Sequence, residues 1–109
     1  MTDVAVLADA LWRATTYASV CQLHLRGNVL LSEPLSHKHV KLDPAGHWGT
    51  VPGTAWALAH IALAAGQTSP ERDVVPILGA GHAGIVQLSV AWLNGELQSI
   101  RPRFTPDVE

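Results

Sequence analysis

At 109 residues, the chain is long enough for one small domain and too short for two. Hydrophobic residues make up 48% of it and charged residues only 15%, which excludes a disordered chain and favours a surface that contacts another polypeptide. The net charge of -2 and the scattered Lys and Arg residues exclude a basic surface for nucleic acid.

The cysteine content and the N-terminal segment predict a cytoplasmic protein. Cys21 is the single cysteine, so no internal disulfide can form, which fits a reducing compartment, and its apolar neighbours favour a buried thiol over a nucleophile. Asp3 and Asp9 stand where a secretory signal carries a basic start. The most apolar stretch, residues 55–65, is shorter than the roughly 20 residues that span a bilayer, so we expect no membrane contact.

Residues 4–26 are predicted to form a helix. Apolar residues recur at steps of three and four, which would line one helix face with Leu7, Leu11, Ala14, Ala18, Cys21 and Leu25. Thr2 or Asp3 can cap the start of this helix, and Gly27 stands where a helix commonly ends.

An irregular stretch follows from residue 28 to residue 53. Its prolines and glycines exclude a long regular element, and loops of this length tend to be functional or disordered. It carries a compact cluster of polar and aromatic residues at 46–50, Gly-His-Trp-Gly-Thr. That composition favours function over disorder.

Two more helices and a strand are predicted after the loop. Residues 54–65 form an apolar helix that we expect to be buried on several faces, with Thr54 as its cap. Residues 73–78 form a continuous apolar run typical of a buried parallel strand, although Pro76 cannot donate to a ladder. The third helix, at 85–93, begins after a glycine-rich turn.

The order helix, long loop, helix, strand, helix predicts an α/β fold. One strand does not make a sheet, so residues 1–109 are expected to be a single partial domain. The tail at residues 101–109 has no periodicity and contains two prolines, which predicts a frayed end.

The turn between the strand and the third helix is the best physical candidate for a binding site. In open α/β sheets, ligands lie beyond the carboxyl ends of the strands. Gly79 and Gly81 let a ligand approach the backbone, and free N–H groups at the helix start attract anions such as phosphate. His82 lies at that helix start, although a purely structural turn explains the same pattern.

His47, between a glycine and a tryptophan, is the second candidate, because functional side chains concentrate in such loops. The alternative is a histidine that bonds a loop carbonyl beside a packed Trp48. His37 and His39 have the spacing of a metal pair, but no cysteine or carboxylate stands at ligand spacing. We therefore expect a solvated pair and no metal site.

Several of these segments resemble the phosphoketolases. Residues 46–53 reproduce that family's signature Gly-His-Trp-Gly-Thr-x-Pro-Gly, and residues 79–85 are similar to its turn Gly-Pro-Gly-His-Gly-Gly-Pro. Trp12-Arg13-Ala14 and Leu93-Asn94-Gly95 also have counterparts in the family. The resemblance extends over residues 11–105.

The resemblance implies an incomplete fragment of a parallel-sheet domain that binds thiamine diphosphate. The complete enzyme would split xylulose 5-phosphate or fructose 6-phosphate with inorganic phosphate, giving acetyl phosphate and an aldose phosphate. It would use thiamine diphosphate and a divalent metal, usually magnesium, in sites between the subunits of a homodimer. The partners of this chain would be the remainder of a phosphoketolase chain or a second subunit.

The resemblance also assigns roles to particular residues. His47 and His82 would be catalytic, because they match histidines that line the family's site beside the cofactor and the sugar. Thr50, Gly79 and Gly81 would contact the cofactor.

Two departures from the family pattern bear on activity. Ala80, Ala83 and Ile85 replace a proline, a glycine and a second proline, so we expect a looser turn. The family's segment for metal and diphosphate, its cofactor-activating glutamate and its sugar-phosphate clamp have no counterpart up to residue 109. We therefore expect the isolated chain to bind no cofactor and to make no acetyl phosphate.

Two other hypotheses remain open. The chain is either a non-catalytic relic or interaction module that retains the fold segment, or an unrelated small α/β binding domain. A neighbouring reading frame that encodes the remainder of a phosphoketolase would separate the first of these from a working enzyme segment.

Overall fold

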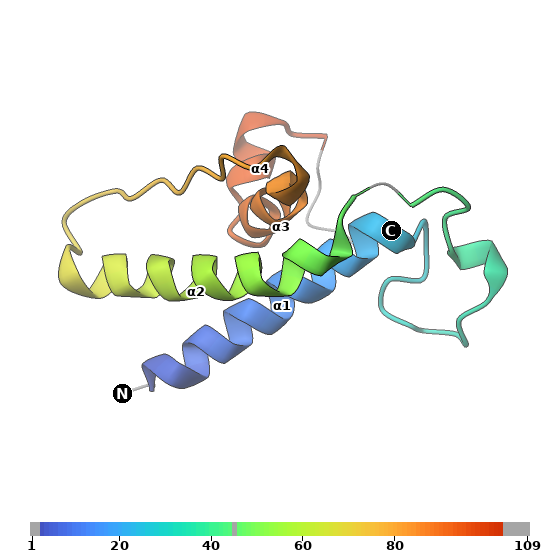
Figure 1. Ribbon diagram of the computed structural model, residues 1–109, viewed down its shortest axis with the longest axis horizontal. Coiled ribbons are helices and arrows are strands. Elements are labelled where there is room, and N and C mark those ends of the chain that lie inside the picture. The colour runs from blue at the N-terminus through green and yellow to red at the C-terminus, as the bar shows by residue number, and fades with distance from the viewer. Residues whose placement is uncertain (1–2, 45, 104–109) are drawn as a thin grey trace.

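The described part of the chain consists of helices and the segments that join them. The computed structural model describes residues 3–44 and 46–103. The α-helices in this part are α1 (Val4–His24), α2 (Val51–Thr68), α3 (Gly84–Leu93) and α4 (Glu96–Ile100). Single turns of 3₁₀ helix lie at His37–His39, Trp48–Thr50 and Gly81–Ala83. Figure 1 shows α1 and α2 as two long helices that cross, with α3 packed over the crossing.

The first predicted helix is confirmed as α1. The Asp3 carboxylate accepts a hydrogen bond of 2.9 Å from the backbone N–H of Ala5, so Asp3 is the N-cap that the sequence predicts. The helix ends at His24, before the expected stop at Gly27, because the backbone becomes extended at Leu25 and pairs with a later segment.

The buried face of α1 is not the face that the apolar pattern predicts. The buried residues of this helix are Ala8, Thr15, Ser19 and Leu23. Leu7, on the predicted apolar stripe, is 43% exposed. The buried side chains are mostly small, which allows close helix packing: Ser19 and Ser89 are fully buried, with their Oγ atoms 3.0 Å apart. Polar contacts therefore join α1 to α3, and the predicted stripe is wrong, because the buried residues lie one or two positions after it.

The apolar core lies where α1, α2 and α3 meet. Its buried members are Leu23, Val51, Ala55, Leu58 and Val86, with Trp12, Leu78, Ile85 and Val90 packed around them. The core is small, because it is formed by one end of α1, the first turns of α2 and one face of α3.

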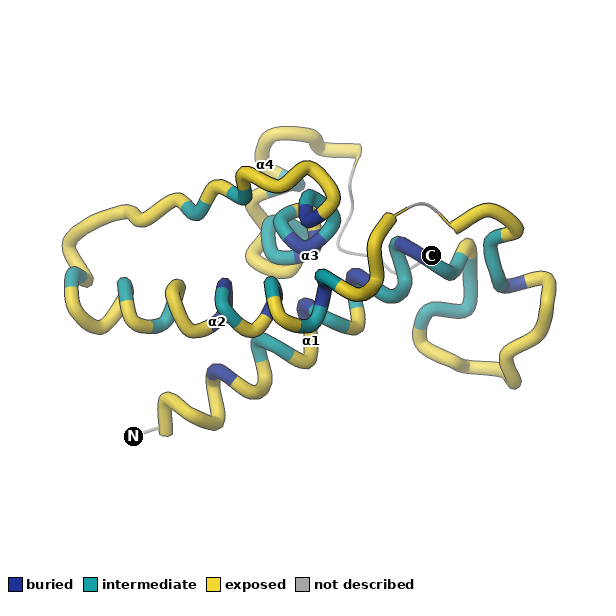
Figure 2. The backbone as a smooth tube through the Cα atoms, viewed as in Figure 1, coloured by how far each residue is buried: buried dark blue, intermediate teal, exposed yellow. Residues whose placement is uncertain are grey.

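α2 is longer and more exposed than the sequence predicts. It begins at Val51, with Pro52 in its first turn, where a missing backbone N–H costs nothing. Trp56 is 51% exposed and Ile61 is 56% exposed, so the predicted burial on several faces is wrong (Figure 2). Although α2 is rich in alanine and leucine, no helix among the described residues combines the length and apolarity needed to span a bilayer.

The predicted strand, and with it the parallel-sheet α/β fold, is contradicted by the structure. Residues 73–78 are extended but belong to no ladder, and the described residues contain no strand. A strand needs a neighbour to satisfy its backbone, and Pro76 also lacks the N–H that a ladder uses. A side chain takes the place of the neighbour here: the Gln87 amide accepts from the N–H of Leu78 (3.2 Å) and donates to the carbonyl of Pro76 (3.0 Å).

The third predicted helix is confirmed as α3. Asn94 caps its end, and Gly95 follows with a φ of 77°, a left-handed conformation that glycine adopts readily. The short helix α4 comes next and was not predicted from the sequence. The predicted frayed tail at 101–109 falls largely on residues 104–109, which lie outside the described residues.

The long loop between α1 and α2 is ordered by its own hydrogen bonds. An isolated antiparallel bridge pairs Leu25 with Val40. The backbone N–H of Arg26 donates to the carbonyl of His39 (2.9 Å), and that of Lys41 donates to the carbonyl of His24 (2.8 Å). We call residues 28–42 the leucine loop, because its exposed apolar residues are Leu30, Leu31, Leu35 and Leu42.

A buried histidine organises the leucine loop from within. His39 is only 6% exposed, so the prediction of a solvated histidine pair is wrong for His39, whereas His37 is exposed. The His39 Nδ1 accepts from the backbone N–H of Ser36 (3.1 Å), so its Nε2 carries the proton and donates to Glu33 (2.9 Å). Lys38 lies 3.2 Å from the same carboxylate oxygen.

These contacts make the free energy of unfolding depend on pH. The hydrogen bond from Lys38, followed by that from His39, lowers the pKa of Glu33 below its ordinary value of 4.5. A carboxyl group with a lowered folded-state pKa stabilises the folded chain above its unfolded-state pKa. That stabilisation is lost as the pH falls through the folded-state pKa.

We expect Glu33→Gln to destabilise the chain at neutral pH. Its effect should become progressively smaller as the pH falls below 4.5 and through the lowered folded-state pKa, where wild-type Glu33 becomes neutral as well. Denaturant unfolding monitored by tryptophan fluorescence between pH 3 and pH 7 measures this difference. Asp43→Asn, at an exposed carboxylate after the same loop, is the matched control. An effect of Glu33→Gln that stays constant across this range contradicts the prediction.

Candidate functional site

The glycine-rich turn before α3 places His82 at the surface. The chain leaves the extended segment at Gly79 and forms a single 3₁₀ turn at Gly81–Ala83, in which the N–H of Ala83 donates to the carbonyl of Ala80 (3.0 Å). Ala83 is buried at 4% exposure, whereas His82 beside it is exposed. The buried alanine therefore anchors the turn while the histidine projects from it.

A close approach of two segments positions the loop that carries His47. Gly46 has a φ of 128°, which side-chain-bearing residues rarely adopt, and a Cβ atom at this position would overlap the Cδ2 atom of Leu23. Leu23 is fully buried at the end of α1, so it has little room to move. Only glycine fits at position 46, and this fit holds the following residue, His47, beside the end of α1.

The residues after His47 join this loop to α2 and to α1. The carbonyl of His47 accepts hydrogen bonds from the backbone N–H of Thr50 (3.1 Å) and from its hydroxyl (2.9 Å). The indole N–H of Trp12 donates to the carbonyl of Pro52 (2.9 Å), which ties the first turn of α2 to α1. The contact from Trp12 was not found by sequence reasoning, because it joins residues forty positions apart.

The fold brings His47 and His82 together. Their ring centroids are 5.3 Å apart, with the ring planes inclined at 73°. Both residues are exposed, so a ligand can reach the two imidazoles from solvent. Two adjacent imidazoles can donate and accept hydrogen bonds and transfer protons, which is the chemistry needed to orient and deprotonate the hydroxyl groups of a small polar ligand.

The other predicted site residues lie around this pair with different exposures. Gly79 and Gly81 are exposed, and a Cβ atom at either position would meet nothing within 4 Å, so the space beside the turn is open. Neither glycine has a positive φ, so these positions do not require glycine for their backbone conformation. Their effect is to leave the space beside the turn free of side chains. Thr50 is half-buried and uses its hydroxyl proton to support the backbone of His47.

Two kinds of chemistry find little support in the described residues. No group of three or more His, Cys, Asp or Glu side chains in this part of the chain is arranged to hold a metal ion. Cys21 is half-buried, and burial raises the pKa of its thiol more than the hydrogen bond with Tyr17 lowers it. A thiol with a raised pKa is a poor nucleophile, in agreement with the sequence-based interpretation.

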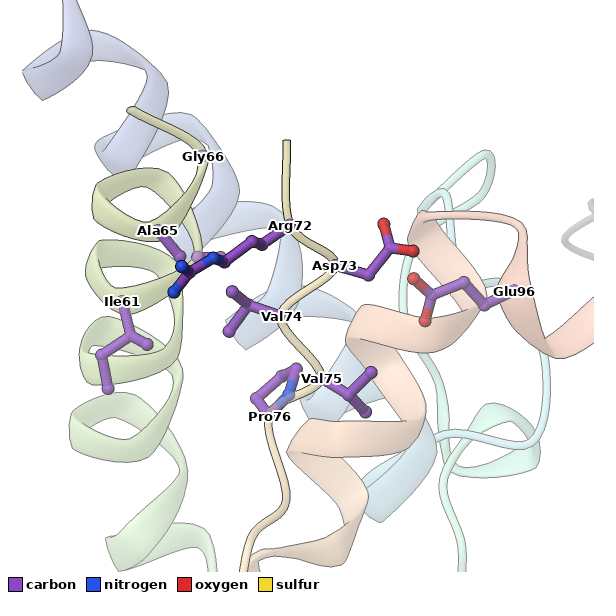
Figure 3. A pocket seen from close by; sticks show the side chains of 10 residues that line it. Ile61, Ala65, Gly66, Arg72, Asp73, Val74, Val75, Pro76 and Glu96 are labelled. Carbon is purple, nitrogen blue, oxygen red and sulfur yellow. The ribbon is translucent and has the colours of Figure 1, made fainter. Parts of the chain in front are cut away.

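A cavity of about 420 Å³ lies away from the histidine pair, between α2 and the extended segment (Figure 3). Its floor includes Ile61 and Ala65 of α2, and its rim carries Arg72, Asp73 and Glu96. Figure 3 shows the carboxylates of Asp73 and Glu96 pointing toward each other, while the Arg72 side chain extends toward Ala65. The two carboxylates outnumber the single guanidinium of Arg72 in this lining and repel an anion, so the histidine pair suits a phosphorylated ligand better than this cavity does.

Comparison with known proteins gives a consistent result over nearly the whole chain. The family model of the XFP N-terminal domain matches residues 2–109. The xylulose-5-phosphate phosphoketolase of Lactiplantibacillus pentosus is 41% identical over 101 residues, which are 93% of this chain and 13% of that protein. A probable phosphoketolase of Clostridium acetobutylicum is 38% identical over 100 residues, 92% of this chain and 12% of that protein. One from Nitrosospira multiformis is 38% identical over 106 residues, 97% and 13% of the two chains.

This chain therefore spans only 12–13% of the length of the curated relatives that it matches. The match alone therefore does not assign the activity of the complete relatives to this chain, because most of their length has no counterpart in residues 1–109.

We expect Gly46→Ala to lower the free energy of unfolding by about 1–3 kcal/mol, because the new methyl group requires both a strained φ and a displaced Leu23. The matched control is Gly49→Ala, three residues further along the same loop, where a Cβ atom meets nothing within 4 Å. Denaturant unfolding of the two variants measures the difference. Equal stabilities would show that Leu23 does not confine this loop.

Proposed function

This chain belongs to the XFP N-terminal family, the N-terminal segment of the phosphoketolases, and from this premise we propose that it supplies the histidine pair of a phosphoketolase site. The proposed reaction splits xylulose 5-phosphate or fructose 6-phosphate with inorganic phosphate. Its products are acetyl phosphate, a shortened aldose phosphate and water. The observation that supports the proposal is the 5.3 Å separation of His47 and His82, which come from different segments of the fold.

Each histidine has a role that its surroundings support. A ketose phosphate carries several hydroxyl groups next to the bond that breaks, and these need both orientation and proton transfer. His82 lies in the turn before α3, next to buried Ala83, and Thr50 bonds the carbonyl of His47. Both imidazoles are exposed and offer their nitrogens to a ligand. We assign them to holding substrate hydroxyls and to carrying protons during cleavage and loss of water.

We propose that the described residues contact part of the cofactor that this reaction needs. The open space beside Gly79 and Gly81 suits the approach of thiamine diphosphate, with Thr50 nearby in the same loop as His47. When bound, thiamine diphosphate supplies the electron sink that allows a carbon–carbon bond beside a carbonyl to break. No described group of side chains fits the divalent metal, so its carboxylate ligands must come from elsewhere in a complete enzyme.

The proposed setting is a cytoplasmic enzyme completed by more phosphoketolase polypeptide, as part of the same chain or as a homodimer. The lone half-buried thiol of Cys21 fits a reducing compartment. Residues 1–109 are then one partial domain.

A second candidate function is a non-catalytic relic or interaction module. The observation that favours it is the turn around His82, where Ala80, Ala83 and Ile85 replace the prolines and glycine of the family pattern. Loss of two prolines removes backbone restraints from the turn. When the rest of the enzyme is present, an enzyme segment would support turnover through the histidine pair, whereas a non-catalytic module would not.

We expect the isolated chain to show no saturable binding of thiamine diphosphate with magnesium and to make no acetyl phosphate. The physical reason is that the described residues hold no set of carboxylates for the metal that anchors the diphosphate. Calorimetric titration and an acetyl phosphate assay measure the two properties. Saturable binding by the monomer would make the chain a self-sufficient thiamine protein and would overturn the proposal that it needs a partner.

We expect the histidines to matter in a chimera in which this chain replaces the matched segment of the Lactiplantibacillus pentosus enzyme. His47→Ala and His82→Ala should each lower kcat by roughly 10²–10⁴-fold while leaving the melting temperature within a few degrees of the parent chimera. His60→Ala, at an exposed histidine that bonds a carbonyl within α2, is the control. Equal losses of stability and activity in both variants would support a purely structural role.

A further inference from the structure

The leucine loop displays large apolar side chains to solvent in one region of the molecule. Leu30 is 65% exposed, Leu31 54% and Leu35 55%, and Leu42 at the end of the loop is 88% exposed. Figure 2 shows the loop as exposed along much of its length. Single exposed leucines are ordinary on protein surfaces, but four in one loop indicate a surface that another polypeptide covers.

The loop is held in the conformation that turns these leucines outward. Leu31 has a φ of 53°, a left-handed conformation that is unfavourable for a residue with a side chain. The N–H of Leu31 donates to the carbonyl of Asn28 (3.0 Å), and the Asn28 amide donates to the carbonyl of Glu33 (2.9 Å). A loop ordered in this way loses little conformational entropy when a partner binds, which favours association.

Further contacts fasten the loop to α1. The Tyr17 hydroxyl donates to the carbonyl of Val29, and the Lys41 ammonium donates to the carbonyl of Gln22. The loop is therefore bonded to α1 in an arrangement that leaves its leucines exposed.

The charges around the loop argue against a symmetric contact with a second copy. Arg26, Lys38 and Lys41 lie on or beside it. These cations outnumber the carboxylates of Asp43 and of Glu33, which is already bonded to Lys38 and His39. In a symmetric dimer formed through this loop, the same cations of both copies would face each other. Repulsion between them disfavours that contact, whereas an acidic and apolar partner surface is attracted.

The family supplies a partner with enough surface. This chain corresponds to 12–13% of the length of its curated relatives, so a complete phosphoketolase contains several times more polypeptide against which the loop can pack. Gly46 and His47 follow the end of the loop by four and five residues in the sequence, so a polypeptide that covers the leucines contacts the segment that leads to the histidine pair.

Building on the proposed function, we infer that the leucine loop is the surface by which this chain docks onto the rest of a phosphoketolase polypeptide. The contacted surface of that polypeptide is apolar and edged with acidic side chains. Docking buries Leu30, Leu31 and Leu35 and brings the remainder of the active site next to His47.

The test uses Leu31→Glu and Leu35→Glu, both in the isolated chain and in the chimera with the Lactiplantibacillus pentosus enzyme. Ser32→Glu is the matched control, because it adds the same charge to an exposed position of the same loop without removing a leucine. In the isolated chain, all three variants should keep the helical circular dichroism of the wild type, because the substituted side chains are exposed. In the chimera, the two leucine variants should lower the fraction that resists limited proteolysis roughly tenfold relative to Ser32→Glu, because docking would bury an unpaired carboxylate.

Two results would overturn the inference. Leucine variants of the chimera that resist proteolysis as well as Ser32→Glu would show that the loop stays exposed in the complete enzyme. Variants that lose helix content in isolation would show that these leucines support the fold of the chain itself. The proposed function can fail while the docking inference holds. In that case the chimera would resist proteolysis and the leucine variants would still lower that resistance, but the chimera would make no acetyl phosphate.

Discussion

The backbone of Gly46 lies against the buried side chain of Leu23, and the position of the candidate site depends on this contact. Leu23 belongs to the last turn of α1 and to the apolar core, so it is fixed by the packing of three helices. The loop that carries His47 can lie so close only because Gly46 lacks a side chain and adopts a φ of 128°. A histidine in a long loop thereby acquires a defined place relative to the helices.

His82 reaches the same place by a different route. It precedes α3, and α3 is held to α1 by the buried pair of Ser19 and Ser89, whose oxygen atoms are 3.0 Å apart. Buried hydroxyl groups need partners: Ser19 and Ser89 each bond a carbonyl of their own helix, and Gln22 of α1 also donates to Ser89, which restricts how α3 can slide along α1. The two imidazoles, 5.3 Å apart, thus both belong to segments that are packed against α1.

The same fold leaves much apolar surface uncovered. Trp56 and Ile61 on α2, Val75 and Ile77 on the extended segment, and the leucine loop are all exposed, while the core is small. A helix that is apolar nearly all round is stable in water only where other elements cover it. The proposed packing against further polypeptide would cover this exposed surface, and the same polypeptide would supply the metal ligands that the described residues lack.

The sequence by itself determined the local features of this protein. It predicted α1 with Asp3 as one of two candidate caps, α3, and the two histidines that the fold brings together, because periodicity, capping residues and short motifs are properties of neighbouring residues. It also predicted the family, because the motif around His47 is specific. The candidate roles of the site residues stay predictions.

Only the tertiary structure decided how these pieces are arranged. The apolar run at 73–78 has the composition of a strand, but no neighbouring strand exists among the described residues and the Gln87 side chain bonds its backbone instead. The buried face of α1 follows the small residues that α3 can approach, and His39 is buried because Glu33 and Ser36 fold around it. Each of these outcomes depends on contacts between segments that local sequence patterns do not connect.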